Sequence, residues 1–188
     1  MSTNVNFNID VQKLAKSLLG RSARNDLAVV VENGTLRNAK VHWSIDPGGH
    51  GEIAELKGNP DISPIDDTRP SVTANFCGLG IHAVGAGSNV LIQIPIADRV
   101  VDIICATPVN KENYSKHRVV HSLHTPEATR VQLEKREKNY ANEGDVEITF
   151  GAVSIWVSMT ATSPAMCKIQ LRETTDRITY GPVSVQMA

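Results

Sequence analysis

Short apolar segments, each bounded by turn-forming residues, recur along most of this chain of 188 residues. Residues 40–45 alternate apolar and polar side chains, as a strand with one buried face does. Turn signals such as Glu32-Asn33-Gly34 and Asp46-Pro47-Gly48-Gly49 interrupt the pattern. The predicted strands are 27–31, 40–45, 72–76, 89–96, 100–106, 146–159, 165–172, 178–180 and 183–185. Many short strands with few helices predict a mainly β domain, either a sandwich or a barrel.

One amphipathic helix is predicted near the start, over residues 10–20. Asp10 suits an N-cap, and Gly20 lies where helices commonly end. The apolar residues recur at helical spacing and form one stripe: Val11, Leu14, Ala15, Leu18 and Leu19. Lysines lie on the opposite face, so this helix is expected either to dock on the body of the domain or to lie on a membrane surface.

A second helix is predicted after Thr125, which can cap it, with Pro126 at its first position and Glu127 in its first turn. The sequence ATRVQLEKREKNY that follows is rich in helix formers and charges, so most of its surface is expected to face solvent.

The chain divides, by this interpretation, into an N-terminal amphipathic helical segment at 1–24 and a β-sandwich domain at 25–188. Residues 78–87 are rich in glycine but lead into the predicted strand NVLIQIPI. A phosphate-binding glycine loop opens a helix, so this stretch predicts a connection between strands.

Charge and composition exclude some functions. The net charge is −1, so no broad basic surface for nucleic acid is expected. No apolar run is long enough to span a membrane, and MSTNVNFNID does not resemble a secretory signal. The three cysteines, Cys77, Cys105 and Cys167, lie far apart and favour a reducing compartment. We therefore expect synthesis in the cytoplasm without a signal peptide, with action there or, after release, at target-cell surfaces.

Catalytic and metal-binding patterns are weak. His117, His121 and His124 have no carboxylate between them, and the third would point away from the first two in an extended chain. The sequence has no nucleophile elbow and no signature around a cysteine. We expect a non-catalytic protein with no metal and no cofactor.

Two stretches are similar to known families. QKLAKSLLG, LAVVVENG, AKVHW and FCGLGIHAVGAGSNVLIQIP resemble, in this order, the actinoporin-type cytolysins. VVDII, EATRVQLEKREKNY and DVEITF resemble the fungal fruit-body lectins, which share the actinoporin β-sandwich. The resemblance implies an actinoporin-like antiparallel β-sandwich with an N-terminal amphipathic helix and one charged helix packed on it.

The lectin resemblance implies a carbohydrate site made by Asp102, Ile103, Arg130 and Tyr140. A carboxylate accepts hydrogen bonds from sugar hydroxyls, a guanidinium donates them, and a tyrosine offers an amphipathic face. The family has a threonine where this chain has Cys105, and the spacing from Arg130 to Tyr140 is one residue shorter. The alternative is that Asp102 and Arg130 are ordinary surface charges.

The cytolysin resemblance implies that the stripe from Val11 to Leu19 inserts into membranes. Those toxins also use exposed aromatic clusters, whereas Trp43 and Trp156 lie here in strand patterns typical of a core.

The leading hypothesis is a lectin-like protein that binds glycans or lipid headgroups on target cells. The alternative is a pore-forming cytolysin, and the second alternative is a capsid-type structural subunit. Expected partners are glycans or membrane lipid headgroups and, in some of these roles, further copies of the chain.

Overall fold

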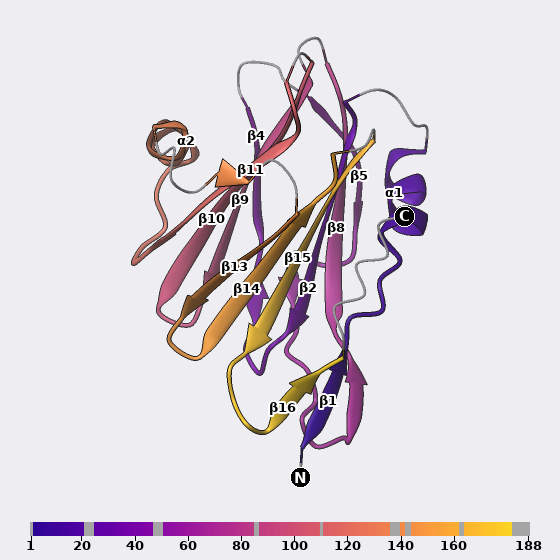
Figure 1. Ribbon diagram of the computed structural model, residues 1–188, viewed down its shortest axis with the longest axis vertical. Coiled ribbons are helices and arrows are strands. Elements are labelled where there is room, and N and C mark those ends of the chain that lie inside the picture. The colour runs from indigo at the N-terminus through magenta and orange to yellow at the C-terminus, as the bar shows by residue number, and fades with distance from the viewer. Residues whose placement is uncertain are drawn as a thin grey trace.

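Two β-sheets face each other across an apolar core in the computed structural model, which describes residues 2–20, 25–46, 51–84, 87–109, 111–135, 140–141, 144–161 and 164–181 (Figure 1). The elements are β1 (Thr3–Asn6), α1 (Val11–Leu19), β2 (Leu27–Gly34), β3 (Ala39–Lys40), β4 (His42–Ile45), β5 (Glu52–Lys57), β6 (Asp61–Ile62), β7 (Ser71–Thr73), β8 (Asn75–His82), β9 (Gly87–Ile96), β10 (Arg99–Pro108), β11 (Tyr114–Val120), α2 (Pro126–Glu134), β12 (Tyr140–Ala141), β13 (Gly144–Phe150), β14 (Val153–Met159), β15 (Ala165–Glu173) and β16 (Ile178–Tyr180). One sheet has the order β13-β14-β15-β2-β8-β5, and the other has the order β12-β11-β10-β9-β4.

The core consists of side chains that alternate along the facing strands. Val29 and Val31 of β2 and Ile92 and Ile103 of the opposite sheet are fully buried in one cluster. Alternation places every second side chain on the same face, so each strand contributes a row to the core. The predicted mainly β sandwich with two helices is thereby confirmed. Most strand pairs are antiparallel, but β2 and β15 are parallel.

Helix α1 packs on the outer face of the six-stranded sheet, whereas α2 packs on the other sheet, so the helices lie on opposite sides of the sandwich (Figure 1). The predicted ends of α1 are confirmed: the Asp10 carboxylate accepts from the Lys13 N–H at 2.9 Å, and Gly20 has φ 61°. Because α1 packs against Ala28 and Met166, its docked form is the one that the structure shows.

Two glycines of β8 allow this close approach. A Cβ atom at Gly80 would lie 2.4 Å from the carbonyl oxygen of Leu18, and one at Gly78 would lie 3.2 Å from the Leu18 side chain. The predicted glycine-rich connection is therefore wrong for these residues, because Gly78 and Gly80 lie inside a strand beneath a helix. Residues 85–86 of that stretch lie outside the described residues.

An unpredicted strand ties the start of the chain to its end. β1 pairs in parallel with both β16 and β7, which gives a three-stranded sheet. Phe7, just after β1, stacks on Tyr180 with ring centroids 5.6 Å apart. The guanidinium of Arg172 lies 5.3 Å from each of these two ring centroids and 4.8 Å from that of Trp156. Aromatic–cation contacts of this kind fasten residues 3–7 to the sandwich.

A buried ion pair fastens the link between β1 and α1. Lys168 Nζ lies 3.1 Å from Glu32 Oε2, and the Ile9 N–H donates to the other Glu32 oxygen at 3.3 Å. Gln170 Nε2 also donates to Glu32, at 3.4 Å. Burial raises the pKa of the Glu32 carboxyl, and this outweighs the opposing effects of Lys168 and the other donors.

The raised pKa of Glu32 predicts a pH effect on stability. The folded chain holds this proton more tightly than the unfolded chain, so the stabilisation from Glu32 is complete below the unfolded pKa and is lost as pH rises through the raised folded pKa. The free energy of unfolding of the wild type, minus that of Glu32→Gln, should therefore increase as pH falls from 7.5 toward the unfolded pKa of about 4.5.

Urea unfolding of both proteins across this range measures the difference. Glu55→Gln is the matched control, because the side chain of Glu55 is 46% exposed. A difference that stays flat or shrinks as pH falls would contradict the prediction.

The second helix and the last strands differ in extent from the prediction. Thr125 caps α2 as predicted, accepting from the Ala128 N–H at 3.4 Å, but the helix ends at Glu134. The predicted single strand 146–159 is a hairpin of β13 and β14 that turns at Gly151, which has φ 54°. The predicted helical residues 136–139, the turn residues 47–49 and the predicted strand 183–185 lie outside the described residues.

Candidate functional site

Asp102 and Ile103, from the predicted carbohydrate site, point to opposite faces of β10. Ile103 is fully buried in the core between the sheets. Asp102 is also 0% exposed and lies beneath α2, where Arg118 Nε is 2.7 Å from Oδ2 and Gln93 Nε2 donates to Oδ1 at 3.0 Å. Both carboxylate oxygens therefore have internal partners.

Arg130 lies in α2 and reaches a different part of the same sheet, at β9 and β4. It is 7% exposed, its Nη1 donates to Asn89 Oδ1 at 2.6 Å, and its Nη2 donates to the Ser44 carbonyl. Burial lowers the pKa of this guanidinium, although Asp46 and two glutamates oppose the shift. Asn89 and Gln93 are four residues apart on β9, about 13 Å along a strand. The structure thus holds Arg130 and Asp102 at separate positions.

Tyr140, the fourth predicted residue, lies in β12 opposite Lys116. Its side chain lies outside the described part of the structure. The carbohydrate role of all four residues stays a prediction.

The Asp102–Arg118 pair instead fastens α2 to the sheet. Arg118 Nη2 donates to Thr129 Oγ1 at 3.1 Å, and Nη1 donates to the Gln132 side chain. Gln93 also donates to the carbonyl of His124, just before the helix, at 3.2 Å. A buried pair with its hydrogen bonds satisfied is costly to break because the remaining charge is left unpaired.

We expect Asp102→Ala to lower the free energy of unfolding by about 3 to 5 kcal/mol, because it leaves Arg118 buried without its counter-ion. Chemical denaturation measures this loss. Asp98→Ala is the control, since that side chain is 79% exposed and should cost less than about 1 kcal/mol. Equal stability of the two variants would contradict the structural role of Asp102.

The predicted membrane-inserting stripe is docked on the sheet. Ala15, Leu18 and Leu19 are buried, and Val11 and Leu14 are half-buried against the same cluster. Nine residues of α-helix measure about 14 Å. Among the described residues, no helix is both long and apolar enough to cross a membrane.

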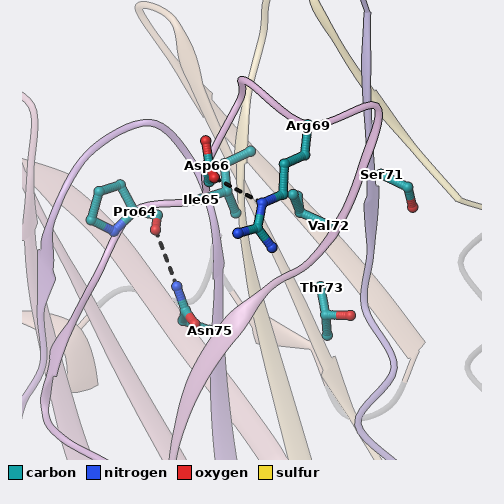
Figure 2. A pocket seen from close by; sticks show the side chains of 8 residues that line it. All are labelled: Pro64, Ile65, Asp66, Arg69, Ser71, Val72, Thr73 and Asn75. Atoms are coloured by element: carbon teal, nitrogen blue, oxygen red, sulfur yellow. Dashed lines mark hydrogen bonds and ion pairs between the residues drawn. The ribbon is translucent and has the colours of Figure 1, made fainter.

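A polar hollow of about 410 Å³ lies beside the loop between β6 and β7, and we call it the loop hollow. Its polar lining is Asp66, Arg69, Ser71, Thr73 and Asn75 (Figure 2). Asp66 Oδ2 lies 3.0 Å from Arg69 Nε, while the Thr68 N–H donates to Oδ1 at 3.1 Å. Hydrogen bonds from Thr68 hold the pKa of Asp66 below its usual value, with a smaller contribution from Arg69, so this carboxyl is ionised at neutral pH.

Contacts with neighbouring strands hold the loop in place. Asn75 Nδ2 donates to the Pro64 carbonyl at 3.1 Å and to the Ser63 carbonyl at 3.2 Å. The Thr3 hydroxyl of β1 lies 2.9 Å and 2.8 Å from the carbonyl oxygens of Asp67 and Arg69. Ile65 is buried in a small cluster with residues of β1 and β16. These contacts preorganise the loop hollow, which lowers the entropic cost of binding.

A second hollow of about 440 Å³ adjoins the first and shares Thr73 and Asn75 with it. Ile9, Ile62, Ala74 and Phe76 contribute apolar surface to this adjoining hollow. The two together offer a polar part and a more apolar part that meet at Thr73 and Asn75.

The predicted strands and helices leave residues 58–70 without an element, and the sequence did not identify the loop hollow. The proline and aspartate composition of this stretch predicts a loop, but the contacts from Thr3 and Asn75 join residues far apart in sequence. Among the described residues, no three histidine, cysteine or acidic side chains are grouped so that they could hold a metal ion.

A scan of protein-family models finds no match, and a comparison with curated proteins finds none either. Among solved structures, the chain is similar to Nakanori, which is described as a lipid-binding protein. The TM-score is 0.59 with 13% sequence identity, over 86% of this chain and 77% of that one. At this identity the likeness shows a shared fold, and the chain is therefore a β-sandwich of the architecture seen in that lipid-binding protein.

Proposed function

We propose that this chain is a non-catalytic, lectin-like protein that binds the polar groups of glycans or lipid headgroups on target cells through the loop hollow. A non-catalytic binding role is supported by the fold that this chain shares with a lipid-binding protein. The observation that carries the proposal is the preorganised set of donors and acceptors around Asp66 and Arg69.

The chemistry of the loop hollow favours hydroxyl groups over phosphate. Asp66 is an acceptor only, Arg69 is a donor only, and Ser71 and Thr73 can do both, while Asn75 keeps its amide oxygen as an acceptor because its amide hydrogens are donated to Ser63 and Pro64. A sugar hydroxyl donates one hydrogen bond and accepts others, so it can bridge such a pair. Since Asp66 and Arg69 cancel in charge, the hollow offers little net attraction to a phosphate.

The adjoining hollow indicates a ligand larger than one sugar ring. Its apolar residues can cover the C–H face of a second ring or the aglycone of a glycoside, while Asp61 and Asn59 remain for hydroxyls. A sugar headgroup on a lipid and a free oligosaccharide share this chemistry.

We expect Arg69→Ala to weaken binding to a glycan identified on a glycan array by at least about tenfold, because charge-assisted hydrogen bonds are worth about 1.5 to 3 kcal/mol. Titration calorimetry measures the loss. Arg37→Ala is the matched control: its side chain is 44% exposed, is ion-paired with Glu173 at 3.1 Å, and does not line either hollow. Disaccharides should bind more tightly than either constituent sugar.

The same binding experiments distinguish a different site or a different ligand. Loss of binding in Tyr140→Ala, with Arg69→Ala unaffected, would move the site to the residues implied by the lectin resemblance. Absence of glycan binding, together with binding to vesicles of phosphatidylcholine, would identify a lipid headgroup without sugar as the ligand.

The cytolysin alternative needs α1 to leave the sheet. The packing of α1 favours this alternative, because the helix lies in a small cluster that is separate from the main core. Deleting residues 1–20 is not a clean test, because the deletion also removes Thr3 and its contacts with the loop.

Charge reversal on the exposed face of α1 is a cleaner test. Lys13 and Lys16 are exposed, so Lys13→Glu with Lys16→Glu should leave the docked helix intact. If the chain is a cytolysin, this variant should release less dye than the wild type from vesicles containing anionic lipid, because the reversed charges repel that surface. Equal release by both proteins, or none by either, would count against insertion through α1.

A further inference from the structure

Two of the three cysteines meet inside the sandwich, from opposite sheets. Cys105 lies in β10 of the five-stranded sheet, and Cys167 lies in β15 of the six-stranded sheet. Both are 0% exposed, and the Cys105 thiol donates to Cys167 Sγ across 3.2 Å. The two residues are 62 positions apart in the chain, and both thiols are free.

We propose that Cys105 and Cys167 are an oxidation site, at which a disulfide bond joins the two sheets. With a peroxide as oxidant, one thiol becomes a sulfenic acid and a water molecule leaves. The second thiol then attacks the sulfur of the sulfenic acid. The S–S bond forms as the S–O bond breaks, and the hydroxyl group leaves with the thiol proton as a second water. Two thiols and one molecule of hydrogen peroxide thus give one disulfide and two waters.

The geometry needs only a small movement. The sulfur atoms must approach by about 1.1 Å to reach the bonded distance of about 2.05 Å. β10 is paired on both sides, with β9 and β11, and β15 is paired with β14 and β2. The two cysteines are therefore held against each other by central strands rather than by edges or loops. A disulfide between the sheets of a sandwich is a known arrangement, as in immunoglobulin domains.

Burial makes the bond slow to form and slow to break. The hydrogen bond to Cys167 and burial raise the pKa of the Cys105 thiol, so little reactive thiolate exists at neutral pH. A small oxidant or a transient opening of the sheets is needed for entry. Once formed, the bond is equally shielded from reducing thiols, so a chain that has been oxidised outside the cell should stay oxidised.

Cys77 provides an internal contrast. It lies in β8 opposite Val31 of β2, and Val31 lies opposite Ile169 of β15. Two strand spacings, about 10 Å, therefore separate Cys77 from β15, which is too far for a disulfide without rearrangement. Burial raises the pKa of the Cys77 thiol to about 12.

The experiment exposes the folded, reduced protein to hydrogen peroxide, removes the oxidant, and then denatures the chain with an alkylating agent. The wild type should be alkylated at one cysteine of three, and peptide mapping should show Cys105 joined to Cys167. The oxidised protein should melt about 5 °C or more above the reduced one, because the link restricts the unfolded chain. Reduction under denaturing conditions should abolish the difference.

Variants complete the test. Cys77→Ser should still form the link, whereas Cys105→Ser and Cys167→Ala should form none and show no rise in melting temperature. Mapping of the wild type decides the question even if a core variant does not fold. Alkylation of all three cysteines after oxidation, or a link that involves Cys77, would overturn the proposal.

Discussion

The central strand β2 is covered on both faces, and much of the structure is arranged around it. All eight of its residues are buried. Val29 and Val31 face the core, while Ala28 faces α1 and Glu32 faces the link between β1 and α1. An antiparallel sheet can leave one face to solvent, but here a helix and a buried ion pair occupy that outer face.

The same N-terminal residues that cover β2 also shape the loop hollow. The Thr3 hydroxyl donates to two carbonyl oxygens of the loop between β6 and β7. Ile9 lines the adjoining hollow, and its N–H donates to Glu32. The proposed ligand site and the docked helix therefore share one support. A cytolysin that released α1 would disturb the adjoining hollow through Ile9, whereas a lectin would keep both in place. The two functional hypotheses thus make opposite demands on residues 7–10.

The sequence predicted those features of the fold, such as helix ends, that depend on residues close together in the chain. Asp10 and Gly20 mark α1, and Thr125 with Pro126 marks the start of α2, because caps act within one turn. Short apolar runs between turn signals, with alternation over residues 40–45, predicted most of the long strands and hence the sandwich, but not β11. β1 and β5 were not predicted, since β1 is short and polar and β5 is a largely exposed edge strand. Gly80 was assigned to a connection between strands. A glycine is needed there because the Leu18 carbonyl oxygen approaches closely, and Leu18 belongs to a helix that is distant in sequence.

Site residues were harder to predict for the same reason. Asp102 was expected to face a ligand or solvent, and nothing near it in sequence reveals that Arg118 and Gln93 enclose it. Cys105 and Cys167 were correctly seen as far apart in the chain, which does not tell how close they are in space. Arg69 and Asp66 form a local pair, but the hollow beside them depends on strands elsewhere in the fold.

The pairing of β1 has a consequence for synthesis. Thr3 lies opposite Ile178, and β2 pairs with β15, so strands made first have partners that are made last. A ribosome releases the chain from its N-terminus at about 5–20 residues per second. Neither β2 nor β1 can complete its sheet until residues 165–180 have emerged. β15 also supplies Met166 to the cluster under α1, so this part of the cover of the apolar stripe forms late, whereas the surface of β2, β8 and β5 is made soon after the helix.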